Sequence, residues 1–458
     1  MPRRLALACW LICLCIASPF AALADDNVTE FFLDNGLHVV VIEDHRAPAV
    51  VHMMWYRIGA ADEPTGQSGI AHFVEHLMFK ATETLATGEF SEIVEANGGT
   101  DNAFTSWDYT GYFQRVAADR LDLMMQMEAD RMTGLVFDAD EVRTERAVIL
   151  EERAQRTDSS PGALFNEQMR AAMFLNHPYG RPIIGWRHEM QNLSLDDAQA
   201  FYETHYAPNN AILIVAGDIT PDDVQRMAQN HYGPIAPSAV SHNRTRPQEP
   251  PHNAFRRVTY EDAQVARPYV AVSYLAPSRE TGAQDEAAAL RLLAELLGGS
   301  GQTSLLATTL QISQERSLFT AAYYDATNLD SSTFTLINMP VPGQSLPQAE
   351  ADLHRVIAEF LENGVDQAQF DRVQFQVHAA QIYARDSVRG LAQEYGAALT
   401  TGLTVQDVQT WPDVIAATTP DDVMAAARRL FDGTHTVTGY LTRPDAPPTA
   451  IQTTGGTQ

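Results

Sequence analysis

Two histidines and a glutamate within five residues have the types and spacing of a metal site. His72, Glu75 and His76 lie in residues 69–80, a stretch without proline that predicts a helix. Positions three and four apart share one face of a helix, so the three side chains point the same way. Two imidazoles placed like this can both reach a Zn²⁺ ion at about 2.0–2.1 Å, with Glu75 beside them to transfer protons. The alternative is a pair of solvated histidines.

A second charged stretch offers a third ligand. Residues 138–153 predict a helix rich in acidic side chains, in which Glu145 and Glu152 are two turns apart and lie on one face. A carboxylate from this helix would complete a His₂Glu site and leave the fourth metal position to water. A solvated acidic face is the alternative, because the whole chain is acidic. The spacing alone does not choose the ligand.

The first 24 residues have the layout of a secretory signal peptide. Arg3 and Arg4 form a basic start, residues 5–16 are apolar, and Ala22 and Ala24 form a small-x-small cleavage site. The apolar run is too short for a membrane anchor, which needs about 20 residues. We therefore predict cleavage after Ala24 and a periplasmic or secreted protein.

Composition excludes several other classes of protein and site. The 458 residues include 58 Asp and Glu against 31 Lys and Arg, a net charge of −27, which disfavours nucleic acid as a partner. A hydrophobic content of 45% suffices for a large core and excludes a disordered chain. All three cysteines (Cys9, Cys13 and Cys15) lie in the predicted signal peptide, which excludes disulfides and cysteine ligands in the mature chain. No later stretch is long enough to span a membrane.

The elements that position these residues occur twice along the chain. A strand is predicted near the start of each half, at residues 47–56 and 267–274, and each half ends with a helix and a strand. Aspartates at the start of those last two helices suit N-caps. One large α/β domain with a long loop is the alternative to two similar domains. We predict two domains of sheet and helices, a linker rich in Pro, Ser and Asn, and a flexible tail, at residues 25–233, 257–445, 234–256 and 446–458 respectively.

Residues 69–80 resemble the signature helix of a known family. The order Gly69-x-Ala-His-Phe-x-Glu-His-x-x-Phe-Lys80 is similar over its whole length to that of the inverzincin metallopeptidases of the pitrilysin and insulinase group. The likeness is greatest to the subfamily of about this length, which includes the subunits of the mitochondrial processing peptidase and their bacterial relatives. In that family the third zinc ligand follows the second histidine by about 76 residues, which implies Glu152 rather than Glu151. Glu145 matches the carboxylate that supports the ligands.

The resemblance implies a fold and a reaction. The expected fold is α+β, with two homologous domains, each a mixed, mainly antiparallel β-sheet packed with α-helices. One zinc ion per chain would be held by His72, His76 and Glu152, and Glu75 would take a proton from the attacking water and return it to the leaving amine. The expected activity is that of a zinc metalloendopeptidase acting on short or unfolded peptides in a closed chamber.

A later stretch of the first half is also similar to the family. The alternating pattern of residues 102–110 predicts an edge strand that could bind an extended peptide by strand addition. Such binding reads the backbone, so selectivity would be broad. An ordinary hairpin strand is the alternative. Residues 97–105 resemble the family's substrate-binding strand, which implies that the peptide contacts Asn102, Ala103, Phe104 and Thr105.

The second half has no counterpart of the histidine motif. At the matching place, residues 285–297 predict an amphipathic helix without histidine. Active relatives use an Arg and a Tyr seven residues apart from this half, and the matching positions here hold Ser313 and Thr320. Arg316 and Tyr323 have the right separation only in a shifted alignment. The resemblance therefore implies the zinc-bearing subunit of a pair, completed by a homologous partner in a heterodimer or a homodimer.

Two other functions are open to this sequence. The first is a catalytically inert homologue that binds peptides or has a structural role, although such proteins usually lack part of the motif and here all of it is present. The second is storage or scavenging of zinc, but the 14 histidines are scattered rather than clustered. A His₂Glu site favours zinc, while cobalt or manganese could replace it in vitro.

Overall fold

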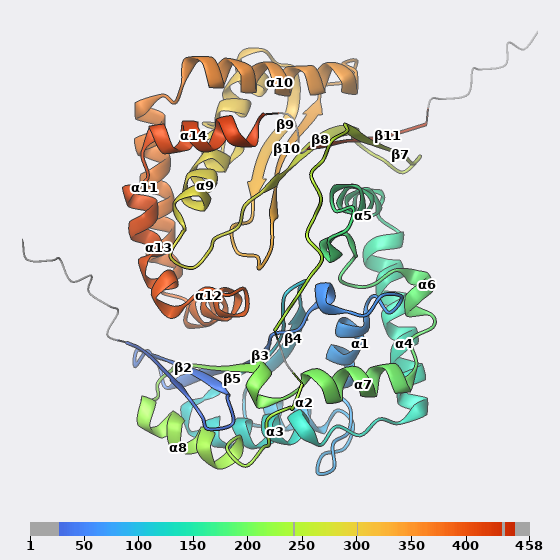
Figure 1. Ribbon diagram of the computed structural model, residues 1–458, viewed down its shortest axis with the longest axis vertical. Helices are drawn as coiled ribbons and strands as arrows, with labels where there is room; N and C mark the ends of the chain where they lie inside the picture. The colour runs from blue at the N-terminus through green and yellow to red at the C-terminus, as the bar shows by residue number, and fades with distance from the viewer. Residues whose placement is uncertain (1–26, 241–242, 300, 433–435, 445–458) are drawn as a thin grey trace, which may run out of the picture.

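The computed structural model describes residues 27–240, 243–299, 301–432 and 436–444. The chain forms two sheets, one in each half, with helices packed around them (Figure 1). The predicted signal peptide with its cysteines, and the predicted tail at 446–458, lie outside the described residues. Among the described residues, no helix has the length and apolar character needed to cross a membrane.

The N-terminal sheet has six strands in the order β1-β2-β6-β3-β5-β4. β2 and β6 are parallel, and the other neighbours are antiparallel. β6 lies inside the sheet and is buried along its whole length, whereas β4 forms an edge. The strands are β1 (Val28–Phe32), β2 (His38–Glu43), β3 (Ala49–Tyr56), β4 (Thr100–Thr105), β5 (Thr110–Ala117) and β6 (Ala211–Gly217).

The C-terminal sheet repeats this arrangement in the order β7-β11-β8-β10-β9. Its one parallel pair, β7 and β11, corresponds to β2 and β6, and its edge strand β9 corresponds to β4. The predicted fold is therefore confirmed: α+β, with two domains built on mixed, mainly antiparallel sheets. The strands are β7 (Arg256–Glu261), β8 (Tyr269–Ala276), β9 (Ser317–Tyr324), β10 (Ser332–Pro340) and β11 (Thr436–Thr442).

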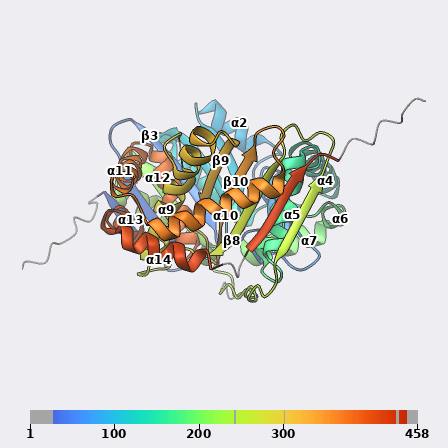
Figure 2. The same cartoon turned by 90° about the horizontal axis from the view of Figure 1, so that it is seen from above.

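Helices cover both faces of each sheet (Figures 1 and 2). Those of the first half are α1 (Ile70–Leu77), α2 (Glu89–Ala96), α3 (Leu121–Thr133), α4 (Ala139–Arg153), α5 (Pro161–Met173), α6 (Arg187–Met190), α7 (Leu195–His205) and α8 (Pro221–His231). Those of the second half are α9 (Asp285–Gly298), α10 (Leu346–Asn363), α11 (Gln367–Ala384), α12 (Val388–Thr400), α13 (Val405–Ala417) and α14 (Pro420–Leu430). A π-helical segment, Ala154–Asp158, continues α4.

One face of the N-terminal sheet is covered by a helix from the other half. Alternate residues of β3 point to opposite faces, so Met54 packs in the core around α1 whereas Met53 and Trp55 pack against α12. Gly396 permits the close approach of α12, because a Cβ atom there would lie 2.1 Å from Cε2 of Trp55. The C-terminal half therefore completes the core of the N-terminal sheet.

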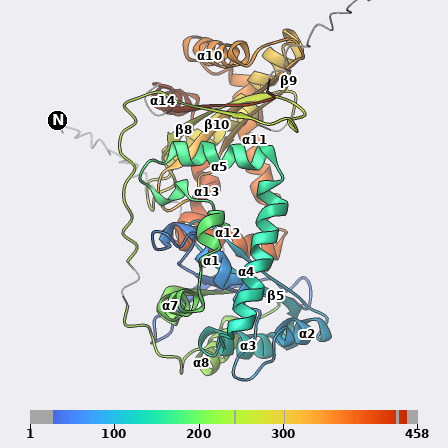
Figure 3. The ribbon, with the colours of Figure 1, turned by 90° about the vertical axis from the view of Figure 1, so that its right-hand side faces the viewer.

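The exchange is reciprocal, because α5 of the first half covers the C-terminal sheet (Figure 3). Phe165 and Met169 of α5 pack with Val437 and Leu441 of β11. Gly439 makes room for them, since a Cβ atom there would lie 2.2 Å from Sδ of Met169. Each half thus contributes one helix to the core of the other half. The exact domain bounds given above stay a prediction.

The aspartates predicted as N-caps of two helices do not hold those positions. The N-caps of α7 and α14 are Ser194 and Thr419, not the aspartates that follow them. Asp197 and Asp422 instead accept hydrogen bonds from the backbone N–H groups of those caps, each at 2.9 Å, which is the capping-box arrangement.

The predicted edge strand at residues 102–110 is two strands and a turn. β4 ends at Thr105 and β5 begins at Thr110, with the N–H of Ser106 donating to the carbonyl of Tyr109 at 2.8 Å between them. The alternation of apolar and polar residues continues through this tight turn, so the pattern alone does not mark the reversal.

Candidate metal centre

The start of α1 is fixed by a glycine and a buried carboxylate. Gly69 has a φ of +89°, which glycine adopts without strain, and a Cβ atom there would lie 2.8 Å from the carbonyl oxygen of Ile184. The carboxylate of Glu63 accepts hydrogen bonds from the N–H groups of Gly69 at 2.9 Å and Ala71 at 3.0 Å. It satisfies two of the donors that a helix leaves free at its first turn.

The apolar residues of α1 hold the helix in the core and leave the histidines on the other side. Ile70, Phe73, Val74 and Leu77 are buried in the N-terminal core. His72 and His76 are partly exposed and face α4. The rings of the two histidines lie 4.7 Å apart between centroids.

α4 brings Glu152 to the histidines. The next residue, Arg153, is 4% exposed and donates to the carbonyl of Gly185 and to Glu167, each at 2.8 Å, which anchors this end of the helix. Arg156 pairs with Oε1 of Glu152 at 2.7 Å. Oε2 of Glu152 is buried and has no hydrogen-bond partner among the residues described.

Glu145 lies two turns earlier on α4 and binds the other side of His76. Its Oε1 is 2.8 Å from Nδ1 of His76, and its Oε2 is 2.5 Å from Nζ of Lys80. Because Nδ1 is engaged, Nε2 is the nitrogen of His76 that points toward Glu152. Glu145 therefore orients a histidine and faces away from the cluster itself.

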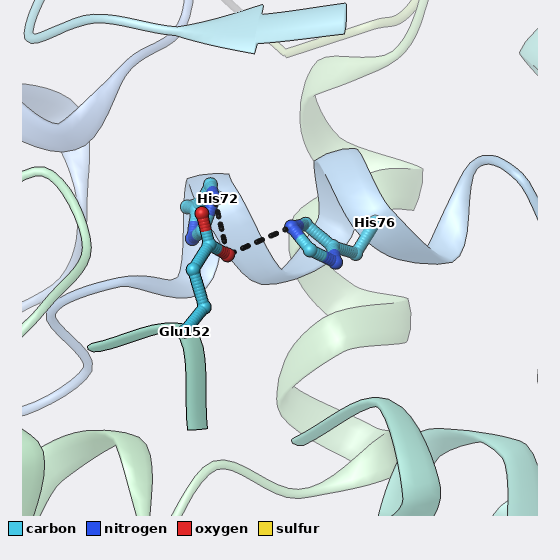
Figure 4. A group of neighbouring side chains, drawn as sticks. All are labelled: His72, His76 and Glu152. Carbon is cyan, nitrogen blue, oxygen red and sulfur yellow. Dashed lines mark ion pairs between the residues drawn. The ribbon is translucent and has the colours of Figure 1, made fainter. Parts of the chain in front are cut away.

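The three candidate ligands converge (Figure 4). Oε2 of Glu152 lies 3.4 Å from Nε2 of His76 and 3.7 Å from Nε2 of His72, and the ligand atoms all lie within 4.8 Å of one another. Two atoms bound tetrahedrally at about 2.0–2.1 Å from zinc are about 3.4 Å apart, so the side chains fit the ion with little movement. Oε2 of Glu152, which has no hydrogen-bond partner among the described residues, is the atom that a cation would satisfy. Within the described ranges, this is the one group of three or more His, Cys, Asp or Glu side chains arranged to hold a metal.

The electrostatic surroundings of the two histidines differ. Burial, together with the charge of His76, lowers the pKa of His72 to about 3, so His72 is neutral and its nitrogen lone pair is available. Burial also acts to lower the pKa of His76, but the hydrogen bond to Glu145 and the nearby carboxylates outweigh it and raise that pKa.

Glu75 has the position and the pKa of a group that transfers protons. It is 8% exposed, and its Oε2 accepts a hydrogen bond from Oγ1 of Thr105 at 2.5 Å. Burial raises the pKa of Glu75 to about 7, although the hydrogen bond from Thr105 acts in the opposite direction. A carboxyl group with a pKa near neutrality can both take up and release a proton.

A cavity of about 830 Å³ joins these groups to the edge strand β4. Of the predicted site residues, the ones that line it are His72, Glu75, His76, Glu152, Asn102, Ala103, Phe104 and Thr105. Glu145 lies behind His76 and is not part of the wall. The N–H of Ala103 donates to Oδ1 of Asn102 at 2.8 Å and not to β5, so it lies on the free edge of the sheet.

Several residues of this cavity were not predicted from the sequence. The guanidinium of Arg170 on α5 lies 3.7 Å from the centre of the Trp107 ring, and both residues line the cavity. Glu63, Lys80 and Arg156 support the site through the contacts given above. Lys80 ends the signature motif four residues after His76, and because α1 ends at Leu77 it lies in the turn that follows the helix. Arg156 follows Glu152 by four residues, and Glu63 precedes Gly69 by six, so these two contacts are also local. The contact of Arg170 with Trp107 joins residues far apart in the chain and leaves no local pattern.

The candidate Arg and Tyr of the second half lie elsewhere. Arg316 donates to Oδ2 of Asp352 at 2.8 Å, and Tyr323 is 55% exposed on the edge strand β9. Thr320 and Tyr323 line a separate cavity of about 550 Å³. Ser313 donates to a carbonyl oxygen of its own π-helical segment, Ala307–Ser313. None of these four residues lines the cavity around the histidines.

Comparison with known proteins places this arrangement in a family. A family model described as insulinase (peptidase family M16) matches residues 38–186, and one described as peptidase M16 inactive domain matches residues 192–377. An uncharacterized zinc protease of Mycobacterium tuberculosis is 31% identical over 358 residues, 76% of each chain. The chain belongs to the insulinase family, peptidase family M16. The first family model contains the histidine motif and Glu152, and the second contains the edge strand β9.

Matches from Helicobacter pylori cover nearly the whole chain. The zinc protease PqqE of Helicobacter pylori is 29% identical over 423 residues, which are 89% of this chain and 91% of the relative. The crystal structure of a protease from Helicobacter pylori superposes with a TM-score of 0.85 at 27% identity, covering 91% of this chain and 99% of that chain. The family resemblance predicted from residues 69–80 is thereby confirmed.

A longer protein of known structure has the same fold. The periplasmic protease PqqL from Escherichia coli superposes with a TM-score of 0.79 at 20% identity, over 93% of this chain but only 48% of PqqL. At this identity the likeness concerns the fold alone. PqqL is therefore about twice as long as the M16 chain described here, which matches about half of it.

Proposed function

We propose that this chain is a zinc-dependent endopeptidase that hydrolyses short or unfolded peptides. The observation that carries the proposal is the convergence of His72, His76 and Glu152 beside Glu75, in a cavity bounded by the edge strand β4. The curated relatives, which are named zinc proteases, support the same activity.

His72, His76 and Glu152 would hold one zinc ion. When bound, zinc polarises a peptide carbonyl and lowers the pKa of water to about 7. Glu75 accepts the proton of the attacking water and returns it to the leaving amine, for which a pKa of about 7 is suited. Glu145 keeps Nε2 of His76 directed at the ion through the hydrogen bond to Nδ1.

β4 would bind the peptide as an added strand. It lies at the edge of its sheet, so the backbone groups on its outer side have no neighbouring strand. Asn102, Ala103 and Phe104 line the cavity along this edge, and Thr105 places its hydroxyl on Glu75. A peptide held here through its backbone would pass directly in front of the proton-transfer group, with little selection among side chains.

We further propose that a homologous subunit completes the site, in a heterodimer or a homodimer. Arg316 is bound to Asp352, and neither Arg316 nor Tyr323 lines the cavity at the metal centre, which supports a partner as the source of the substrate-binding pair. The match to half of PqqL supports an enzyme assembled from two such lengths of chain. Two facing units would enclose a chamber that admits short or unfolded peptides and excludes folded proteins.

We also propose a periplasmic or secreted location. The layout of residues 1–24 supports export with cleavage after Ala24. The description of PqqL as a periplasmic protease is in keeping with this.

The decisive experiment measures bound zinc and the cleavage of a quenched, unstructured peptide by the purified chain, beside a Glu75→Gln control. Cleavage by the wild type and not by the control supports a self-sufficient peptidase. One zinc ion per chain without cleavage supports the subunit of a pair, and addition of the homologous partner should then restore activity. If the Glu75→Gln protein still supports the native role, the inert peptide-binding homologue is favoured. If the purified chain binds no zinc, the proposal of a zinc enzyme is wrong.

A further inference from the structure

A second cavity lies behind the start of α1. It has a volume of about 390 Å³ and is bounded by the end of β3, the segment leading to α1 and linker residues 243–247. It shares no lining residue with the cavity at the metal centre. Its walls carry the arginines Arg57, Arg181, Arg244 and Arg246. Four arginines around one cavity are unexpected in a chain with a net charge of −27.

Among the described residues, Arg246 is the one of these four arginines that pairs with carboxylates. Arg246 pairs with both oxygens of Asp62 at 2.8 Å, with Asp108 at 2.5 Å and with Asp330 at 2.9 Å. This network joins the linker to both halves of the chain. It also engages both oxygens of the Asp62 carboxylate, which lies in the cavity wall.

Arg181 and Arg244 are bound to neutral acceptors. Arg181 donates to the carbonyl of Glu63 at 3.0 Å, and Arg244 donates to the backbone carbonyls of Asp108 and Thr400. In the part of the chain that the structure describes, neither guanidinium forms an ion pair with a carboxylate. Burial lowers the pKa of Arg244, as does the charge of the adjacent Arg246, although the charges of Asp62 and Asp108 act in the opposite direction.

Arg57 differs from the other three arginines of the cavity wall. It follows the last residue of β3 and is partly buried, and across the described ranges its guanidinium makes neither a hydrogen bond nor an ion pair. Burial and the nearby charge of Arg244 lower the pKa of Arg57 to about 10. A half-buried, unpaired guanidinium is unfavourable unless an anion is supplied to it.

An unpaired acceptor lies in the same cavity wall. Asn210 is 1% exposed, and its Nδ2 donates to the carbonyl of His205 at 2.9 Å, which fixes the orientation of the amide. Its Oδ1 is buried and accepts no hydrogen bond from the residues described. The cavity therefore combines a cation that lacks an acceptor with an acceptor that lacks a donor.

We propose that this cavity binds a small oxyanion that also carries a hydroxyl group, of the hydrogen phosphate class. The fork of Arg57 matches two oxygens of such an ion, and Arg244 adds a second positive charge. The hydroxyl of the ion would donate to Oδ1 of Asn210. Because the wall includes Glu63, whose carboxylate holds the first turn of α1, the bound ion would stabilise the segment that begins the candidate catalytic helix.

The test is titration of the zinc-loaded protein with inorganic phosphate at constant ionic strength, followed by calorimetry and thermal unfolding. We compare the wild type with Arg57→Gln and with Arg143→Gln. Arg143 is an exposed arginine on α4 whose ion-pair partner among the described residues is Asp140. Phosphate should raise the unfolding temperature of the wild type and of Arg143→Gln. The Kd should rise by about tenfold or more in Arg57→Gln, because charged hydrogen bonds are lost. Sulfate, which has no hydroxyl, should bind the wild type more weakly than phosphate.

Two results would overturn the proposal: no phosphate binding to the wild type at millimolar concentration, or equal phosphate affinity for the wild type and Arg57→Gln. Phosphate bound at the metal centre would affect both proteins equally, so it cannot imitate the expected difference. If Arg57→Gln does not fold, Arg57→Lys provides the comparison, since a point charge without the fork should bind phosphate more weakly than arginine does. Equal zinc content in all variants keeps this outcome separate from that of the proposed peptidase.

Discussion

Replacing Glu145 by glutamine tests how the candidate ligand His76 is held. The two oxygens of Glu145 serve two cationic or donor groups, Nδ1 of His76 at 2.8 Å and Nζ of Lys80 at 2.5 Å. Glutamine has the same shape, but one end of its amide is a donor. Whichever way the amide turns, one of the two contacts becomes a donor facing a donor, and the negative charge is lost in either case.

The expected size of the effect follows from that loss. One hydrogen bond to a charged group contributes about 1.5–3 kcal/mol, and loss of a group that orients a metal-binding histidine weakens metal binding by about 10- to 100-fold. The Kd for zinc, measured by competition with a chromophoric chelator at fixed pH, should therefore rise by about 10- to 100-fold in Glu145→Gln.

The neighbouring Glu151 provides a matched control on the same helix. Its side chain is exposed, and its Oε1 accepts a hydrogen bond only from Gln155, at 2.9 Å. Glu151→Gln should bind zinc like the wild type, while Glu152→Gln should lose more affinity than Glu145→Gln. Equal zinc affinity in Glu145→Gln and Glu151→Gln would refute the reasoning that Glu145 orients His76.

Other substitutions test the surroundings of Glu75, the dependence of stability on pH and the contact between the halves. Thr105→Val removes the hydroxyl that donates to Glu75, so kcat for peptide cleavage should fall by about tenfold at unchanged zinc content, and an unchanged kcat would separate this hydroxyl from the reaction. Burial opposes ionisation of Asp407, but hydrogen bonds from two threonines and two backbone N–H groups outweigh it and lower its pKa to about 2. The ionised group therefore adds to the free energy of unfolding above about pH 4, and this contribution is lost as the pH falls through 2. Asp407→Asn should therefore lower the free energy of unfolding by about 2 kcal/mol from pH 7 to pH 4 and by less below pH 4, as followed by urea unfolding, and a loss independent of pH would contradict this. Gly396→Ala should lower the free energy of unfolding by about 1–3 kcal/mol, because its methyl group would meet a buried indole, whereas Gly162→Ala on α5, which has open space around it, should not.

The parts of the fold that depend on residues close together in the chain could be predicted from the sequence. α1 carries its motif within eight residues, and a helical period alone places His72, Glu75 and His76 on one face. The buried strand β6 is a continuous apolar run that needs no knowledge of its neighbours. The N-caps Ser194 and Thr419 could also be predicted, since each precedes by three residues an aspartate that can complete a capping box. The prediction chose the aspartates because several of them lie at the start of each helix.

Contacts between distant residues could not be predicted in this way. Helical spacing could not choose between Glu151 and Glu152, and the family resemblance was needed to propose the ligand. Nothing in the sequence marks Arg170 as the partner of Trp107, because the contact depends on how α5 packs. The exchange of α5 and α12 could not be predicted for the same reason, since the apolar face of a helix does not indicate which sheet the helix will cover.

That exchange has a consequence for the growing chain. The strands of the N-terminal sheet are all present once Gly217 has been synthesised, but α12, which covers one of its faces, ends at Thr400. A chain that emerges from its N-terminus, either from the ribosome or from the far side of a membrane, therefore has its N-terminal sheet before the helix that covers it. During that interval a wide apolar surface around Trp55 stays open to water and to other nascent chains. A product truncated before α12 should therefore aggregate and be degraded quickly, because only a nearly complete polypeptide can bury this surface.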